Sequence, residues 1–98
     1  MKVSYVYILK CSDDTYYTGI TSNLEKRLLE HKTGKHNNSY TYHRRPIKLV
    51  YKTEFSDIKL AISTEKQIKK WSRVKKEALI NGEYEKLPNL AKKNFSKD

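Results

Sequence analysis

The most unusual position in the sequence is an acidic residue within an apolar stripe. Four apolar residues in the second half of the chain recur at helical spacing and share one helix face: Ile58, Ala61, Ile62 and Ile68. Glu65 follows three residues after Ile62 and lies near the middle of that face. A carboxylate that faces a core is costly unless it is paired or binds a metal. Glu65 is therefore either half of a structural ion pair with a nearby cation or a ligand for a divalent metal ion.

A cation and a histidine accompany the apolar face of an earlier predicted helix. Leu24 and Leu28 define its buried side, and Arg27 and His31 lie beside them by the same angles. The guanidinium of Arg27 offers a fixed fork of donors that suits a phosphate, but Arg27 and Glu65 could also simply satisfy each other. His31 is a candidate proton carrier, although a lone histidine is more often structural.

Tyrosines are the third feature with chemical potential. Four of the eight crowd one predicted hairpin: Tyr5, Tyr7, Tyr16 and Tyr17. Aromatic residues are ordinary strand formers, so packing is the default interpretation. Tyr7 and Tyr17 gain a chemical role only if their hydroxyls meet beside the arginine and the acid described above.

The net charge of +10 on 98 residues predicts a polyanionic partner. No acid occurs between Glu30 and Glu54, a stretch that mixes cations with Tyr40 and Tyr42, and a second cationic run follows Glu65. Cations interleaved with aromatics favour a groove for phosphates and unstacked bases. The residues predicted to bind nucleic acid from these two runs are Lys35, Arg44, Arg45, Lys69, Lys70 and Arg73. A merely solvated face, an acidic membrane surface, a ribosome or an acidic protein partner are the alternatives.

These residues need a scaffold, and the first half of the chain predicts a hairpin, a helix and a strand. Residues 3–11 and 15–19 are rich in β-branched and aromatic residues and are separated by Ser12-Asp13-Asp14, which favours a turn. Ser22 and Glu25 form a capping box for a helix to about His31, ending before Gly34. Residues 32–45 predict a loop, and Pro46 opens a strand over 47–51.

The second half predicts helices. Ser56-Asp57 caps a helix that runs to about Trp71, and Ser72 caps another over residues 73–81 that Gly82 closes. Pro88 allows a short final helix through Phe95. Strands followed by helices in this order indicate an α+β fold, an antiparallel sheet packed with helices. We expect one domain, with residues 83–98 as a short helix and tail of the same unit as residues 1–82.

Composition excludes several other classes. No apolar run approaches the roughly twenty residues that span a bilayer, and the N-terminus shows no signal-peptide pattern. Cys11 is the single cysteine, so the chain can form neither an internal disulfide nor a cysteine-based zinc site. The expected location is the cytoplasm, with no membrane and no disulfide-linked partner.

Taken in order, these motifs resemble the GIY-YIG nuclease signature over about residues 3–80. The matching elements are Tyr5-Val6-Tyr7, Tyr17-Thr18-Gly19, Asn23-Leu24 with Arg27, and Glu65. Longer segments such as Tyr-Val-Tyr-Ile-Leu-Lys-Cys and Glu-Lys-Gln-Ile-Lys-Lys-Trp-Ser-Arg are similar to the small stand-alone bacterial branch known as UPF0213. The resemblance implies a three-stranded antiparallel sheet flanked by helices.

The resemblance also implies a chemistry and its residues. Family positions map onto Tyr7, Tyr17, Gly19, Arg27 and Glu65, with Gly19 expected among the nucleic-acid-binding residues. His31 would lie near the scissile phosphate, and Asn81 is a loosely aligned further candidate. Glu65 would hold one Mg²⁺ or Mn²⁺, Tyr17 helped by Tyr7 would accept a proton from water, and Arg27 would favour the phenolate and hold the transition state. The implied activity is a metal-dependent endonuclease that cuts nucleic acid, DNA rather than RNA. A non-catalytic nucleic-acid-binding module on the same scaffold is the second hypothesis.

Three positions depart from the family pattern. Tyr5 replaces the glycine of the first motif, and Thr18 replaces the isoleucine of the second. Ile20 stands where the excision-repair relatives have a lysine, so one activating cation is missing. These departures bear on specificity and turnover more than on the fold.

Overall fold

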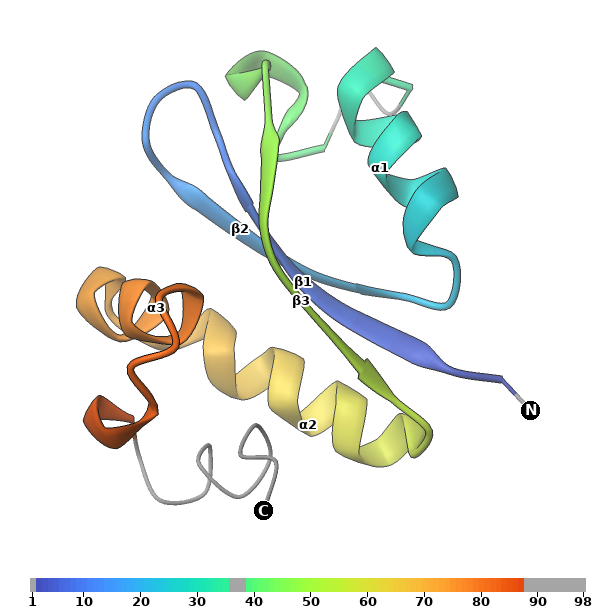
Figure 1. The fold of residues 1–98 in the computed structure, drawn as a ribbon. Helices are drawn as coiled ribbons and strands as arrows, with labels where there is room; N and C mark the ends of the chain where they lie inside the picture. Colours follow the sequence, from blue (N-terminus) through green and yellow to red (C-terminus); the bar gives the residue numbers. More distant parts are fainter. Residues whose placement is uncertain (1, 36–38, 88–98) are drawn as a thin grey trace.

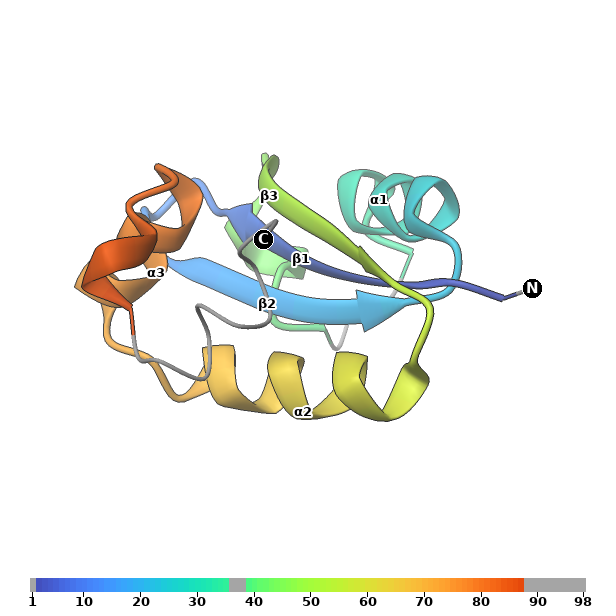
Figure 2. The ribbon, with the colours of Figure 1, turned by 60° about the horizontal axis from the view of Figure 1, so that its bottom comes forward.

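A three-stranded antiparallel sheet organises the molecule. The structure is a computed structural model, and residues 2–35 and 39–87 are described. Strands β1 (Ser4–Lys10), β2 (Tyr16–Thr21) and β3 (Lys48–Phe55) lie in the order β2-β1-β3, and both pairings are antiparallel. The α+β fold expected from the sequence is confirmed, because helices flank this sheet on both faces (Figures 1 and 2).

Strand β1 is central because both of its alternating side-chain sets are apolar and both are buried. Val6 and Ile8 face one side of the sheet, Tyr7 and Leu9 face the other, and all four are fully buried. The sheet therefore separates two cores. Figure 2 shows it in cross-section, with α1 (Leu24–Thr33) above the sheet and α2 (Ile58–Lys69) below it.

The core below the sheet is the larger. Val6 and Ile8 pack there against Ala61 and Ile68 of α2 and against Leu79 of α3 (Arg73–Ile80). Trp71, in the turn between these two helices, is 9 % exposed and joins the same cluster. The described chain ends with a 3₁₀ turn, Tyr84–Lys86, and Leu87 closes this core at 5 % exposed. Residues 83–87 therefore pack with the rest of the described domain.

Several element bounds differ from the sequence-based expectation. Strand β2 runs from Tyr16 to Thr21 rather than over 15–19, because it pairs with β1 from Tyr5 to Lys10. Strand β3 reaches Phe55, because it pairs with β1 from Ser4 to Lys10. Asn23, not Ser22, is the N-cap of α1, and its side chain accepts from the Lys26 amide. A 3₁₀ turn, Tyr42–Arg44, interrupts the predicted loop. The helix predicted over 88–95 lies outside the described residues.

The buried face of α2 is rotated relative to the apolar stripe in its sequence. Ile58 is 53 % exposed and Ile62 is 41 % exposed, so the expectation that they face the core is wrong. The buried residues are Ala61, Thr64, Glu65 and Ile68. Glu65 is thus on the packed face for a different reason: the sheet, which contacts α2 mainly through β2, selects which side of the helix turns inward.

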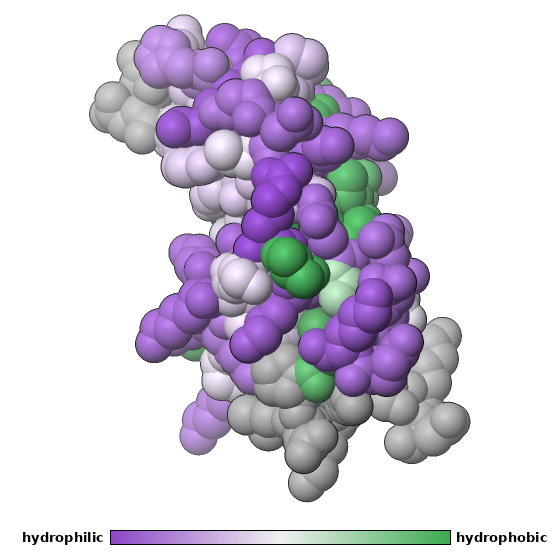
Figure 3. Space-filling view, turned by 90° about the vertical axis from the view of Figure 1, so that its left-hand side faces the viewer, coloured by the Kyte–Doolittle hydropathy of each residue, from purple (hydrophilic) through white to green (hydrophobic). Residues whose placement is uncertain are grey.

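One face of the molecule is dominated by polar side chains. Figure 3 views the molecule from the left-hand side of Figure 1 and shows a mostly hydrophilic face with small apolar spots. Within the described ranges, no helix combines the length and the apolar character that a bilayer span needs.

Candidate active site

The hydroxyl of Tyr7 lies at the centre of the candidate site. Tyr7 points from β1 to the α1 side of the sheet and is fully buried. Its Oη lies 3.0 Å from Nε2 of His31, which α1 supplies near its C-terminal end. The other ring nitrogen, Nδ1, lies 2.8 Å from Oγ1 of Thr41, a residue of the loop before β3. A tyrosine, a histidine and a threonine therefore form one hydrogen-bonded series through the interior.

Three more predicted residues act electrostatically on the same phenol. The pKa of Tyr7 is raised to about 12, chiefly by burial and then by a negative charge on Tyr17, whereas a hydrogen bond from Arg27 and its positive charge act to lower it. Glu65 exerts a smaller upward effect on the same pKa. Side chains from β1, β2, α1 and α2 thus act on one phenol, and the catalytic roles expected of them stay predictions.

Gly19 provides the space for this hydroxyl. Tyr7 and Gly19 are directly paired across β1 and β2. A Cβ at Gly19 would lie 2.4 Å from the Tyr7 Oη, far inside contact distance. The predicted role of Gly19 in nucleic-acid binding is not tested, but its local role is clear: the absence of a side chain lets the phenol stand over the edge strand.

Glu65 is buried but lies next to solvent. It is 7 % exposed, and its Oε2 lies 2.7 Å from Nζ of Lys69, one helical turn later. The Lys69 side chain is 54 % exposed, so the pair lies at the boundary between core and solvent. The bond to Glu65 raises the pKa of Lys69, and a charge on Tyr17 adds to this rise. The ion-pair interpretation of Glu65 is therefore correct for the protein without a bound metal, and the partner is Lys69, not Arg27.

Arg27 has a different carboxylate partner. Its Nε lies 3.4 Å from Oε1 of Glu30, and Lys35 contacts the other oxygen of Glu30 at 3.5 Å. The Arg27 side chain is 40 % exposed. A hollow of about 160 Å³, lined in part by Arg27, Thr21 and Lys26, opens beside it. Solvent and a small anion can therefore reach the guanidinium.

Tyr17 links the site to the loop that carries Thr41. Its ring lies 5.3 Å from that of His31 and stacks on Tyr40, with the two tyrosine centroids 5.8 Å apart. Arg44 covers Tyr40 at 3.9 Å and bonds to Asp13 at 3.1 Å. Tyr17 and Tyr40 are both partly exposed, so they form the solvent-facing wall of the site.

The other cations predicted to bind nucleic acid mostly have internal partners. Arg45 lies over Tyr42 at 4.6 Å and donates to its carbonyl. Arg73 contacts Glu77 at 3.2 Å, lies over the Tyr16 ring and donates to the Asp14 carbonyl. Lys70 is exposed. Nucleic-acid binding by these residues stays a prediction, and the structure gives Arg45 and Arg73 a local role in fastening a loop and the hairpin turn.

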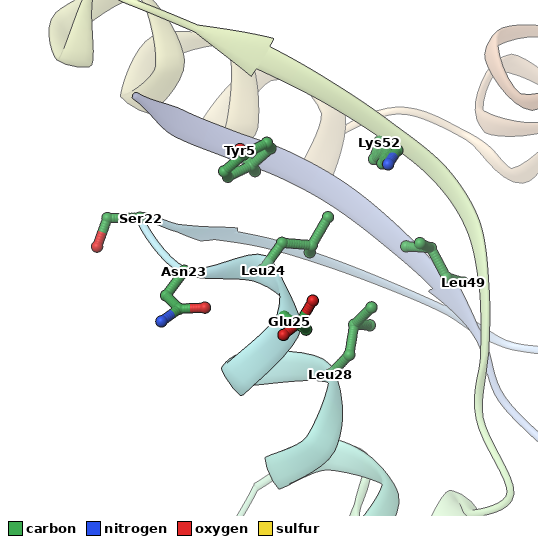
Figure 4. A pocket seen from close by; sticks show the side chains of 8 residues that line it. All are labelled: Tyr5, Ser22, Asn23, Leu24, Glu25, Leu28, Leu49 and Lys52. Atoms are coloured by element: carbon green, nitrogen blue, oxygen red, sulfur yellow. The ribbon is translucent and has the colours of Figure 1, made fainter. Parts of the chain in front are cut away.

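A separate groove of about 440 Å³ lies on the same face of the sheet (Figure 4). Its walls are Leu24 and Leu28 from α1, Tyr5 from β1, and Leu49 and Lys52 from β3. Neither Tyr7 nor Glu65 lines it. The predicted site residues therefore converge elsewhere, at the β2 edge.

The described residues limit which metal could bind. Among residues 2–35 and 39–87, no three His, Cys, Asp or Glu side chains are grouped as a metal cage would require. Glu65 is a single carboxylate. Mg²⁺ keeps several waters and is often held by one or two carboxylates together with substrate phosphates, so this donor set fits such an ion but not zinc.

Thr41 is the site residue that sequence reasoning missed, and Tyr40 was expected only as an aromatic among the cations of the predicted nucleic-acid groove. Thr41 is completely buried and bonds to His31. Both residues lie in a polar, basic segment where nothing in the sequence distinguishes a core position from a solvated one. The one available signal was that Tyr40 and Tyr42 bracket Thr41, which indicates local packing.

Comparison with known proteins identifies the family. The family model described as "GIY-YIG catalytic domain" matches residues 3–78. A UPF0213 protein of Syntrophus aciditrophicus is 48 % identical over 87 residues, covering 89 % of this chain and all of the relative. One from Natronomonas pharaonis is 44 % identical over 79 residues, which is 81 % of this chain and 92 % of the relative.

Two solved structures agree with the fold. The solution NMR structure of a UPF0213 protein from Bacillus halodurans has a TM-score of 0.55 at 39 % identity, covering 81 % of this chain and 83 % of that one. A protein from E. faecalis has a TM-score of 0.61 at 33 % identity, with 84 % and 86 % coverage. With the matched motif positions converging on one phenol, the chain belongs to the GIY-YIG catalytic-domain family, among its small UPF0213 members.

Proposed function

We propose that this protein is a divalent-metal-dependent endonuclease that hydrolyses phosphodiester bonds, with DNA as its substrate. The observation that carries the proposal is the convergence on Tyr7. The Tyr7 phenol is fully buried, is hydrogen-bonded to His31 and Arg27, and has its pKa raised by charges on Tyr17 and Glu65. Burying so many polar groups together is more costly than packing alone requires. The family resemblance favours DNA over RNA.

In this proposal Glu65 holds one Mg²⁺ or Mn²⁺. When bound, the metal would supply Lewis-acid stabilisation of charge on the phosphate and on the leaving oxygen. Binding requires Lys69 to give up the carboxylate, which its exposed side chain and the flexible lysine stem permit. Once released from Glu65, the ammonium of Lys69 would lie beside Tyr17 and the phosphate backbone of the bound nucleic acid. This position is consistent with the predicted role of Lys69 in nucleic-acid binding.

The two tyrosines have different roles. A negative charge on Tyr17 raises the pKa of Tyr7, so it disfavours ionisation of the buried phenol. Tyr7 is buried and its pKa is raised to about 12, so it stays protonated and donates to His31. Tyr17 is only half-buried, so it is the phenol that meets the attacking water.

Proton movement then runs from the solvent side inward. As the water oxygen forms its bond to phosphorus, its proton passes to the Tyr17 oxygen. In this proposal Tyr17 passes its own proton to the oxygen of Tyr7, whose ring centroid lies 6.3 Å from that of Tyr17. Tyr7 passes its proton to Nε2 of His31, to which it is hydrogen-bonded. Each phenol gains one proton and loses one, the imidazole gains one, and the 3′ oxygen leaves with the electron pair of its broken bond and takes a proton from solvent.

Arg27 stabilises charge in two places. Its guanidinium lowers the pKa of Tyr7, which limits the cost of any negative charge that develops on the phenols. Its exposed side, next to the hollow that it lines, can donate to the non-bridging oxygens of the phosphate as they gain charge. Glu30 holds the side chain in place through its contact with Nε.

The test is cleavage of plasmid, branched and single-stranded DNA, with RNA counterparts, in Mg²⁺ and in Mn²⁺. Glu65→Ala and Arg27→Ala should each abolish cleavage. Tyr17→Phe should do the same, whereas Tyr16→Phe on the neighbouring residue is the matched control, because the Tyr16 hydroxyl bonds to Glu77 on α3. Equal cleavage by the Glu65 variant would point to a contaminating nuclease and would refute the assignment.

The second candidate function is a nucleic-acid-binding module without catalysis. The short bond between Glu65 and Lys69 favours it, because the carboxylate already has a cation in the free protein. Such a module would bind DNA equally well in chelator and would cleave no substrate with any metal. Binding to either nucleic acid should weaken steeply with salt; an acidic protein partner would be indicated if nucleic-acid binding were absent.

A further inference from the structure

Thr41 contacts the far ring nitrogen of His31, the proposed proton acceptor. The proposed function assigns no role to Thr41. It is 0 % exposed, although it comes from a polar loop. Its Oγ1 lies 2.8 Å from Nδ1 of His31 and 3.3 Å from Oγ of Ser39. Buried polar groups are normally hydrogen-bonded, so the direction of each bond in this series is constrained by its neighbours.

The directions can be derived from one end. A guanidinium has donors and no acceptor, so in its bond with Tyr7 the Arg27 side chain donates and the phenol oxygen accepts. The proton of that phenol has Nε2 of His31 as its hydrogen-bond acceptor in the described part of the chain, and a buried hydroxyl is normally satisfied, so the phenol donates there. A neutral imidazole carries one proton, so with Nε2 bare the proton is on Nδ1 and is donated to Thr41. The Thr41 hydroxyl is left to donate to Ser39.

We propose that Thr41 is a positioning residue that fixes the tautomer of His31, keeping Nε2 unprotonated and aimed at the Tyr7 hydroxyl. This inference rests on the proposed function for its catalytic consequence. His31 can accept the proton that leaves Tyr7 only if Nε2 is bare. Once it has accepted that proton, the imidazolium keeps its Nδ1–H bond to Thr41, so the ring does not have to reorient during the reaction.

The loop is built to hold Thr41 in that place. Tyr40 before it is clamped between Tyr17 and the guanidinium of Arg44, and the Arg44 amide donates to the Thr41 carbonyl. The carbonyl of Arg44 in turn accepts from the backbone amide of Ser12 in the β1–β2 turn. Arg44, which the sequence predicted to bind nucleic acid, thus also helps to hold Thr41 against His31.

The alternative for Thr41 is a purely structural hydroxyl. A structural role would make Thr41→Val lower the stability and would leave the protonation pattern of His31 and the chemical step unchanged. Valine has the same shape as threonine but cannot accept a hydrogen bond, and serine keeps the hydroxyl. The pair Thr41→Val and Thr41→Ser therefore separates the two roles.

The first measurement is independent of activity. Nitrogen-15 NMR of the imidazole side chains distinguishes a protonated Nδ1 from a protonated Nε2, and His31→Asn identifies which signals belong to His31. We expect the Nδ1–H form in the unaltered protein and in Thr41→Ser, and a shift toward the Nε2–H form in Thr41→Val. An Nε2–H form in the unaltered protein would overturn the proposal.

The second measurement is steady-state cleavage of the best DNA substrate. For Thr41→Val we expect kcat to fall by about ten- to a hundredfold with little change in KM, and for Thr41→Ser we expect most of the rate to return. Unchanged kcat in a folded Thr41→Val variant would overturn the catalytic part. If the unaltered protein cleaves nothing, the proposed function fails while the NMR result still decides the role of Thr41. If Thr41→Val does not fold, the tautomer of the unaltered protein decides.

Discussion

The two faces of the sheet share the same strand but bury different chemistry. Below the sheet, Val6 and Ile8 meet aliphatic and aromatic side chains of α2 and α3. Above it, Tyr7 meets a histidine, an arginine and a second tyrosine. Alternation along β1 thus connects a hydrophobic core directly to the candidate site. The lower face holds the strand in place, and the upper face uses that rigidity to fix one hydroxyl.

This contrast predicts that substitutions on neighbouring β1 residues fail in different ways. Ile8→Ala removes a fully buried side chain from the lower core and should lower the free energy of unfolding by about 2–5 kcal/mol. Tyr7→Phe, next to it, keeps the ring and should lose cleavage while keeping most of the stability. Denaturant unfolding and cleavage rates measured on both variants check the contrast. A stable Ile8→Ala variant would mean that the lower core does not support the sheet.

Gly19 is the position where a substitution should lower both the stability and the cleavage rate. A Cβ there meets the Tyr7 Oη at 2.4 Å, and a fully buried ring cannot swing away freely. Gly19→Ala should therefore cost about 1–3 kcal/mol of stability and reduce cleavage at least about tenfold by displacing the phenol. Thermal unfolding and cleavage rates are the measurements.

Gly82→Ala is the control for that experiment. Gly82 has a positive φ of 74° and no atom within 4 Å of an added Cβ, so alanine there introduces backbone strain without a clash. Its stability should fall while its cleavage rate stays unchanged. Equal loss of cleavage in both variants would show that activity follows stability and not the position of Tyr7.

The pKa of Tyr7 predicts a pH-dependent contribution to stability from the upper face. Its pKa rises from 10.0 to about 12 in the folded protein, so the unfolded chain loses this proton at lower pH than the folded chain does. The contribution is complete below pH 10 and is lost as the pH rises from about 10 through about 12. Unfolding free energies measured across this window should fall less steeply for Tyr7→Phe. A residual slope is expected, because burial also raises the pKa of Tyr51.

Local patterns in the sequence predicted the strands, because alternation is encoded nearby in the chain, whereas the expectation that Tyr7, Arg27 and Glu65 share a site came from the family resemblance. The packed side of α2 was mispredicted because the sheet, not the isoleucines, selects it: Ile58 and Ile62 face outward. The sheet that orients α2 is a tertiary partner, and it leaves no local signal in the helix sequence. The cap of α1, by contrast, has local partners: the Asn23 side chain accepts from the Lys26 amide, and the Asn23 amide donates to the Thr21 hydroxyl.

The contacts that cations and loop residues make inside the protein could not be predicted from the sequence either. Arg73 was predicted to face phosphates, yet its partners come from the hairpin turn, fifty-nine residues away in the chain, and from its own helix. Thr41 looked like any polar loop residue and is fully buried against His31. In both cases the function of the side chain depends on contacts between distant segments, which composition and periodicity do not report.

Thr18 offers the test with the smallest expected effect on the contrast between the two faces of the sheet. Its hydroxyl faces the lower core, between the site residues Tyr17 and Gly19, and is the buried side-chain oxygen without a hydrogen-bond partner in the described part of the chain. An unsatisfied buried hydroxyl is destabilising, so Thr18→Val should raise the free energy of unfolding by about 1 kcal/mol. Cleavage should not change, because the side chain lies on the opposite face from Tyr7.

Thr21→Val on the same strand is the matched control, because the Thr21 hydroxyl bonds to the amide and the carbonyl of Asn23. That variant should be less stable than the unaltered protein, since it loses bonds at the start of α1. Denaturant unfolding of the two valine variants should therefore move in opposite directions. If Thr18→Val were destabilised as well, its hydroxyl would have to hydrogen-bond in solution, and the hydroxyl would not be an unsatisfied group of the lower core.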